Sequence, residues 1–327
     1  MPYGSKSILT MALRNSIHDL TDSIAADRHA MHKNPQTSYA EDYASNLVAE
    51  RLIEWGIPFE RGIAVTGIVA TIEGEKTDSG RIIGLRADMD ALDIIEQSGQ
   101  PWSSKIPGKM HGCGHDGHTA MLLGAAKYLS ENRNFNGTVH LIFQPAEEGD
   151  AGALKMIQEG LFEKYPMDAV YGLHNWPSLT KGQISVREGP MMAASDFFFM
   201  TVHGKGGHAA FPHYTVDPVP IAAQIITGLQ TLVSRSTDPL DSSVITVCNL
   251  EGGTGALNVI GDKVTMNGSV RSFKAETRDM LERRIGEMAK GISEAMGARV
   301  EYEYRRGYDP TLNDPVQTRL CTEVAHE

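Results

Sequence analysis

The sequence predicts an α/β fold in which a mostly parallel sheet carries helices on both faces and an α+β domain is inserted. Three observations predict this class. Strand-like and helix-like segments alternate over residues 1–186, as they do in parallel sheets covered by helices. Beyond residue 187 the order changes to strand, helix, strand, strand, helix, strand, which is typical of a self-contained α+β sandwich. The length of 327 residues also favours two domains over one.

The individual elements follow from the spacing of apolar residues. In residues 8–33 and 40–55 apolar side chains recur every three or four positions, which predicts two helices. The remaining elements of the first part are strands at 67–72, 81–87, 138–143 and 169–173 and helices at 119–132 and 151–162. Those of the inserted part are strands at 197–203, 243–250, 263–273 and 299–304 and helices at 215–234 and 276–296. We therefore expect one domain formed by 1–186 and 304–327 and an inserted domain at 187–303.

Composition excludes several classes of protein. The chain has 30 Lys and Arg against 41 Asp and Glu, a net charge of −11, which opposes binding to nucleic acid and to anionic membrane surfaces. No stretch is long and apolar enough to span a bilayer, and the N-terminal residues lack the apolar core of a secretory signal. Three scattered cysteines are too few for a disulfide framework. A soluble cytoplasmic protein is the expectation.

The densest chemical signal is the segment His111–His118, which reads His-Gly-Cys-Gly-His-Asp-Gly-His. Imidazole, thiol and carboxylate groups are the ligands that zinc and neighbouring transition metals prefer. The intervening glycines let the backbone turn, so that adjacent side chains can converge. Two alternatives remain open at this point: a polar loop with chance histidines, and a structural zinc site, which would need a closed set of four ligands.

Other potential ligands follow the predicted strands. Glu147 and Glu148 come just after one apolar strand, His174 closes the next, and Asp88 and Asp90 end an earlier one. A glutamate pair alone is usually a solvated loop, and a single histidine at a strand end is usually hydrogen-bonded rim structure. Because the carboxyl ends of parallel strands meet at one edge of a sheet, however, we expect these groups to surround one point.

Several motifs in the same order resemble the aminoacylase/carboxypeptidase family of dinuclear metallohydrolases, and most closely its branch of hippurate hydrolases and auxin–amino-acid conjugate hydrolases. The segments that carry the resemblance in the first domain are 28–35, 86–92, 111–118, 144–149 and 173–175. In the inserted domain they are 204–213, 252–260 and 271–273. The resemblance therefore covers essentially the whole chain.

The resemblance implies roles for residues of the first domain. It assigns Glu147 as the general base and Asp90 as an aspartate that supports the metal centre from behind the ligands. It also implies two divalent metal ions, zinc in the first place and manganese, cobalt or nickel as alternatives. The metal ligands that it implies are Cys113, His115, Glu148 and His174.

For the inserted domain the resemblance implies a lid that also forms a homodimer through residues 187–303. It assigns His208 to a histidine that reaches the scissile carbonyl, often across the dimer interface, and Asn258 and Arg271 to groups that hold the substrate's carboxylate. Without the resemblance, the glycine-rich segment before His208 would read as a plain hairpin turn and Arg271 as a surface charge.

The expected function is metal-dependent hydrolysis of N-acyl amino acids of the hippurate type to a carboxylic acid and a free amino acid. Alternatives are a dipeptidase or an N-acetyl-diaminopimelate deacetylase of the same family, or a weakly active metal-binding dimer. The chain ends at Glu327, before the segment in which the family carries its last metal-binding histidine. We therefore expect an under-coordinated second metal, in either a truncated form of an active enzyme or a natural short form.

Overall fold

The structure is a computed structural model that describes residues 4–326, with side chains from Ser16 onward. The chain divides into two compact units: the first ends at Ile184, and the second covers Ser185–His326. The second unit includes residues 304–326, whereas the sequence led us to expect that they return to the first domain. That return stays a prediction.

The first unit is built on a mixed sheet. In the described part of the chain its strand order is β1-β2-β4-β3-β5. β3 pairs in parallel with β4 and with β5, as predicted, but β2 pairs antiparallel with both β1 and β4. β1 was not predicted; a turn of only a few residues joins it to β2, and so short a connection permits only antiparallel pairing. The strands are β1 (Phe59–Ile63), β2 (Gly67–Glu73), β3 (Ile82–Asp88), β4 (Thr138–Gln144) and β5 (Ala169–Gly172).

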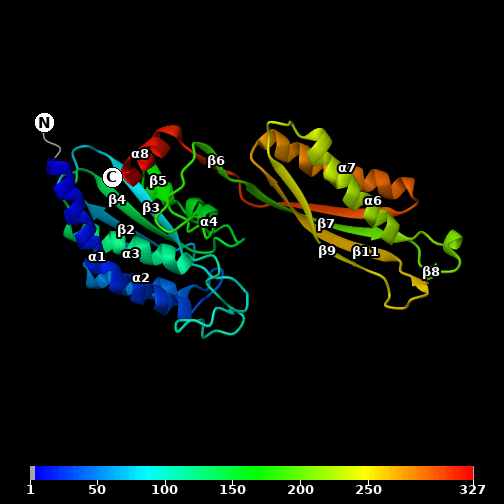
Figure 1. Cartoon of the computed structure of the whole chain (residues 1–327), viewed down its shortest axis with the longest axis horizontal. Coiled ribbons are helices and arrows are strands. Elements are labelled where there is room, and N and C mark those ends of the chain that lie inside the picture. The colour runs from blue at the N-terminus through cyan, green and yellow to red at the C-terminus, as the bar shows by residue number, and fades with distance from the viewer. Residues whose placement is uncertain (1–3, 327) are drawn as a thin grey trace. The chain divides into compact units, whose positions relative to one another are not determined.

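Helices cover both faces of this sheet (Figure 1). Alternate residues of β4 face opposite sides: Leu141 and Phe143 pack with the helices of one face, and Ile142 packs with Met156 on the other. The predicted helix at 151–162 is broken at Gly160, whose φ of +93° is left-handed. The first face carries α1 (Gly4–Lys33), α2 (Asp42–Glu54) and α3 (His115–Glu131), and the second carries α4 (Gly152–Gln158) and α5 (Leu161–Lys164).

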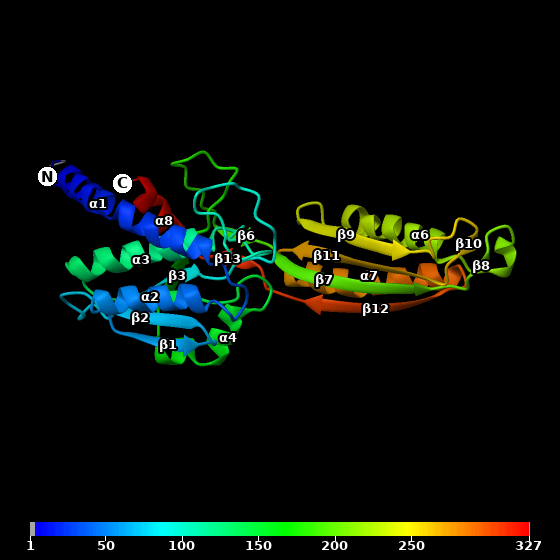
Figure 2. The ribbon, with the colours of Figure 1, turned by 90° about the horizontal axis from the view of Figure 1, so that it is seen from below.

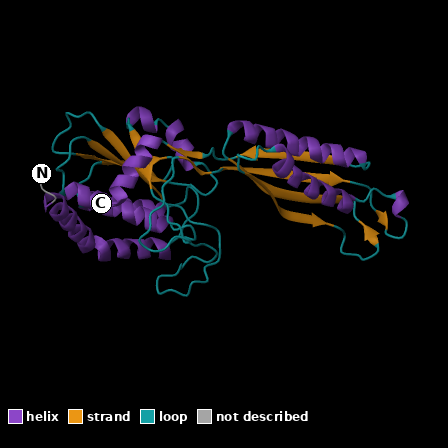
Figure 3. Cartoon of the chain, turned by 45° about the horizontal axis from the view of Figure 1, so that its top comes forward, coloured by secondary structure: helices purple, strands orange, loops and turns teal. Residues whose placement is uncertain are grey.

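The second unit has its own antiparallel sheet with the strand order β12-β7-β11-β9, which Figure 2 shows. Along the chain the order is strand, helix, two strands, helix and strand, the predicted order. Buried residues of β7 such as Phe198 and Val202 pack against the two helices on one face (Figure 3). The elements are β7 (Ala194–His203), α6 (Pro218–Thr231), β9 (Ser243–Gly252), β11 (Lys263–Ser272), α7 (Ala275–Ala295) and β12 (Arg299–Arg306).

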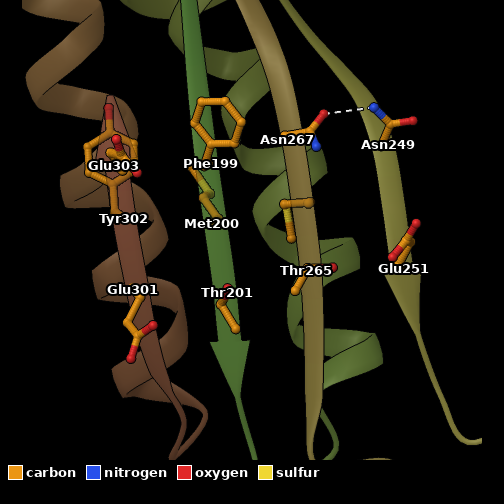
Figure 4. Close-up of a pocket in the computed structure, with 11 residues that line it drawn as sticks. Phe199, Met200, Thr201, Asn249, Glu251, Thr265, Asn267, Glu301, Tyr302 and Glu303 are labelled. Carbon is orange, nitrogen blue, oxygen red and sulfur yellow. Dashed lines mark hydrogen bonds between the residues drawn. The ribbon is translucent and has the colours of Figure 1, made fainter. Parts of the chain in front are cut away.

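The opposite face of that sheet is open and mostly polar. It forms a shallow hollow in which the Asn249 and Asn267 side chains hydrogen-bond at 2.8 Å (Figure 4). None of the predicted site residues lines this hollow.

Shorter elements complete the described chain. They are β6 (Gly189–Met192) paired with β13 (Thr311–Asn313), β8 (Gly207–His208) paired with β10 (Val259–Ile260), a 3₁₀ turn (Pro212–Tyr214), a π-helical turn (Leu232–Ser236) and α8 (Pro315–His326). Among the described residues, every helix is too short or too polar to cross a bilayer.

Candidate metal centre

The parallel part of the first sheet sets the location of the centre. Asp88, the last residue of β3, pairs in register with Gln144, the last residue of β4. The Glu147–Glu148 pair follows β4 directly, and His174 follows β5 on the other side of β3. The strand ends therefore bring residues from distant parts of the sequence to one edge of the sheet, where open α/β sheets bind ligands.

Donor atoms converge at this edge around His115, the first residue of α3. Three overlapping groups each hold three potential metal-ligand atoms within 4.8 Å of one another. The groups are Cys113–His115–His174, Asp88–His115–His118 and His115–Glu147–Glu148. The residues to which the resemblance assigned the metal ligands and the general base thus lie together.

The His115 ring is oriented to present one nitrogen to these oxygens. Its Nδ1 lies 3.1 Å from Asp90 Oδ1, so the carboxylate holds the proton on that side. Its Nε2 is buried and has no hydrogen-bond partner among the described residues. Carboxylate oxygens of Glu148 and Glu147 lie 3.8 and 3.9 Å from Nε2. Two ligand atoms of one tetrahedral zinc ion lie about 3.4 Å apart, so this arrangement suits a divalent cation.

Cys113 and His174 form a second pair of donors. The thiol Sγ lies 3.3 Å from His174 Nε2, while His174 Nδ1 donates to the Asn175 carbonyl at 2.7 Å. That bond leaves the lone pair of Nε2 facing the thiol. Gly114 makes the approach possible, since its φ is +89° and an added Cβ would lie 2.5 Å from the Asn175 side chain. A thiol and an imidazole on the same side are a ligand pair that zinc favours.

His118 belongs to the segment singled out from the sequence but was not among the assigned ligands, and it orients a neighbour. Its Nδ1 lies 2.6 Å from Asp88 Oδ1, and its Nε2 accepts the Asn175 N–H at 3.0 Å. Both ring nitrogens are therefore used within the protein. Asp88 Oδ2 also accepts a hydrogen bond from the Arg86 guanidinium at 2.7 Å, so the carboxylate is held by two side chains. The spacing of His115 and His118 by three residues on one helix was the signal in the sequence.

Glu41 is another residue that sequence reasoning missed. It is fully buried and accepts hydrogen bonds from the Ala146 N–H at 2.8 Å and the Thr66 hydroxyl at 2.6 Å. Ala146 has a φ of +50°, which is unusual for a residue with a Cβ. Glu41 thus holds the turn that delivers Glu147 and Glu148. Nothing in the local sequence marks Glu41, because its partners are far along the chain.

The electrostatics favour a cation. Burial alone would lower the pKa of His115, but Asp90, Cys113 and Asp88 raise it to about 11. Burial and the adjacent Glu148 carboxylate both raise the pKa of Glu147. The negative charge collected at this edge of the sheet contributes to both shifts, and the same charge would attract a divalent cation in place of a proton.

The remaining predicted residues lie in the second unit. His208 is exposed on β8, and the neighbouring Ala209 N–H donates to the Asn258 carbonyl at 2.9 Å, so His208 and Asn258 are close. Arg271 lies elsewhere. It pairs with Ser195 at one end of β11, while β8 and β10 lie beyond the end that begins at Lys263 (Figure 2). At about 3.3 Å per residue these two ends are about 26 Å apart. The structure therefore does not bring the Asn258 and Arg271 of one copy to one substrate carboxylate.

Known proteins are similar to this chain over nearly its whole length. The profile of peptidase family M20/M25/M40 matches residues 84–327. The IAA-amino acid hydrolase ILR1-like 4 of Arabidopsis thaliana is 45% identical over 322 residues, which cover 97% of this chain and 71% of that protein. The hippurate hydrolase of Campylobacter jejuni is 41% identical over 317 residues, or 97% of this chain and 82% of its own length. A Bacillus subtilis crystal structure, described as a dinuclear metal-binding M20 peptidase, superposes with a TM-score of 0.77 at 34% identity, covering 94% of this chain and 80% of that one.

Proposed function

The chain belongs to peptidase family M20/M25/M40 and is a metal-dependent amidohydrolase, and from this premise we propose that it hydrolyses N-acyl amino acids of the hippurate type. The resemblance stated from the sequence motifs is thereby confirmed. One observation carries the metal-dependent part of the proposal: the buried Nε2 of His115 faces the Glu147 and Glu148 carboxylates without a hydrogen-bond partner among the described residues. The hippurate-type substrate is drawn from the similarity to the Campylobacter jejuni hippurate hydrolase.

We propose that this centre holds two divalent ions, with zinc as the first candidate and manganese, cobalt or nickel as alternatives. Support comes from the donor set and from the similar Bacillus structure described as dinuclear. Divalent ions, when bound, acidify a water molecule and polarise an amide carbonyl. The proposed ligands are Cys113, His115, Glu148 and His174.

Glu147 acts in this proposal as the general base. It lies beside the proposed ligand Glu148, and its carboxylate is partly open to solvent, with 36% of the side chain exposed. A carboxylate at that position takes a proton from the attacking water and later delivers it to the leaving amine. Asp90 takes no part in the proton transfer; it accepts from His115 Nδ1 and from the Glu148 N–H, at 3.1 and 2.9 Å.

A Glu147→Gln variant tests these assignments. We expect it to lose release of glycine from hippurate while its zinc content, measured on the purified protein, stays near that of the parent. Loss of the metal together with turnover would show that the two glutamates have the opposite roles. The parent protein is also loaded with zinc, manganese or cobalt and given several amino acids that carry aromatic, indole-type or short acyl groups. If it hydrolyses none of them, the proposed activity is refuted.

We propose further that a complete substrate pocket uses lid residues from two copies in a homodimer through residues 187–303. Support comes from the two ends of β11, since Asn258 and Arg271 of one copy lie too far apart to share a carboxylate. His208 would then stabilise the oxyanion, and Asn258 of the same copy as His208 would hold the substrate. Arg271 of the other copy would bind the substrate's carboxylate with two hydrogen bonds.

Subunit mixing distinguishes this arrangement from one in which each copy works alone. Glu147→Gln and His208→Ala are each expected to be inactive. Random mixing of the two variants makes about half of the dimers heterodimers. If His208 acts in the neighbouring copy, each heterodimer has one intact site of its two, so about a quarter of the parent activity returns. No recovery in dimers shown to have exchanged subunits would place His208 and Glu147 of the same copy in one site.

A further inference from the structure

An ionic cluster lies next to the proposed metal centre, and none of its members is a proposed ligand; its aspartate and histidine are buried, and its arginine is half-exposed. Its central residue, Asp116, follows His115 in the first turn of α3 and is 1% exposed. Asp116 Oδ2 accepts from Arg28 Nε at 3.1 Å and lies 2.9 Å from His32 Nδ1. Arg28 and His32 are four residues apart, on the same face near the end of α1.

The second ring nitrogen of His32 is also held. Its Nε2 lies 3.3 Å from Glu96 Oε1 in the loop between β3 and α3. Glu96 is fixed in turn by the Ser104 N–H at 2.5 Å and by the Ser98 hydroxyl. Both nitrogens of the His32 ring therefore have a partner, and the residue is 6% exposed, so the ring holds Asp116 in a fixed position.

The start of α3 is held on one side by Asp88 and Asp90, which contact His118 and His115, and it lacks a capping side chain of its own. Its N-cap residue is Gly114, which has no side chain and makes no capping hydrogen bond. A capping side chain, where one is present, bonds to N–H groups of the first turn and so restrains it. Here the first turn carries His115, and the ionic contacts to Asp116 supply a restraint from α1.

We infer that Arg28, His32 and Asp116 act as a clamp that positions the first turn of α3, so that His115 presents Nε2 to the metal centre. These three are positioning residues, since none of them is a proposed ligand. The inference rests on the proposed metal centre and is independent of the substrate. Partners behind metal ligands commonly change affinity by about 10–100-fold when removed, and we expect a loss in that range.

Two substitutions of His32 separate the two contacts of its ring. The amide nitrogen of asparagine can occupy the place of Nδ1, so His32→Asn keeps a donor for Asp116 and loses the contact with Glu96. Glutamine reaches the place of Nε2, so His32→Gln keeps a donor for Glu96 and loses the contact with Asp116. Asp116→Asn removes the charge at the centre of the clamp. Asp42→Asn is the matched control, because Asp42 is also in the first turn of a helix but is exposed.

The readout is the dissociation constant of Zn²⁺ from the full chain, measured by competition with a chromophoric chelator. We expect about 10–100-fold weaker binding for Asp116→Asn and His32→Gln, and binding within about threefold of the parent for His32→Asn and Asp42→Asn. Thermal unfolding of each metal-free variant shows whether it is folded. If Asp116→Asn is unfolded, the comparison of the two His32 variants decides.

Zinc binding by Asp116→Asn and His32→Gln as tight as that of the parent would overturn the clamp. An equal loss in His32→Asn and His32→Gln would also overturn it, because His32 would then act through packing or Glu96 and not through Asp116. Hippurate hydrolysis is measured separately. Parent protein that binds zinc but releases no amino acid refutes the proposed activity and leaves the clamp to be judged by the affinities.

Discussion

Asp90→Asn is the substitution that most directly tests how the proposed metal centre is oriented. Asp90 is 1% exposed and receives two donors, His115 Nδ1 at 3.1 Å and the Glu148 N–H at 2.9 Å. Asparagine has nearly the same shape but one oxygen and one NH₂ group. One of the two donors must therefore face an NH₂ group. If that donor is His115, its proton has to move to Nε2, the nitrogen that is needed for the metal.

The expected loss can be worked from these contacts. A hydrogen bond to a charged acceptor contributes about 1.5–3 kcal/mol, and one such bond is lost. The 10–100-fold decrease in metal affinity that is typical for such partners corresponds to about 1.4–2.7 kcal/mol, which is the same range. We therefore expect zinc to bind to Asp90→Asn about 10–100-fold more weakly, with a parallel fall in turnover at limiting zinc.

Zinc affinity is measured by chelator competition on protein that is shown to be folded by thermal unfolding. Asp93→Asn is the control, since Asp93 lies three residues further along the same segment with 72% of its side chain exposed, and we expect no change there. Equal affinities of Asp90→Asn and the parent would refute the reasoning, because they would mean that neither the charge nor the orientation of His115 depends on Asp90.

Two further predictions concern stability. Gly114→Ala places a Cβ on a residue with a left-handed backbone, 2.5 Å from the Asn175 side chain. We therefore expect a lower melting temperature and weaker zinc binding, and we expect a second substitution, Asn175→Ala, to restore both in part. An unchanged melting temperature of Gly114→Ala would contradict this. Asp196→Asn breaks a buried ion pair in which Arg278 lies 2.6 Å away, and we expect it to destabilise the second unit by about 3 kcal/mol at pH 7. Burial alone would raise the pKa of Asp196, but hydrogen bonds from Arg278 and Tyr304 outweigh it and hold that pKa below its usual value. The stability that the carboxylate contributes is therefore complete above its ordinary pKa of about 4, and it is lost as the pH falls through the lower pKa of the folded state. The free energies of unfolding of parent and variant, measured in urea, should therefore become more similar below about pH 4. A difference that stays constant down to pH 2 would show that the charge of Asp196 is not what stabilises the unit.

Some of the site could be predicted because its parts are local in sequence. The segment His111–His118 and the Glu147–Glu148 pair each place several ligand types within a few residues, and strand ends indicated where they meet. Apart from Asp90, which the resemblance assigned, the positions behind the proposed ligands could not be predicted. Glu41 meets Ala146 across 105 residues, and His32 meets Asp116 across 84, so only packing brings them together.

The sequence by itself determined most of the helices and strands, the chemical types of the proposed ligands and the two-part organisation, because apolar spacing and ligand clustering are properties of short stretches of chain. Tertiary structure alone decided that β2 runs antiparallel to β4 and that His118 hydrogen-bonds to Asp88. It also decided that Asn258 and Arg271 lie near opposite ends of β11. Strand pairing and hydrogen bonding between distant residues depend on how whole elements pack, and no local pattern encodes that geometry.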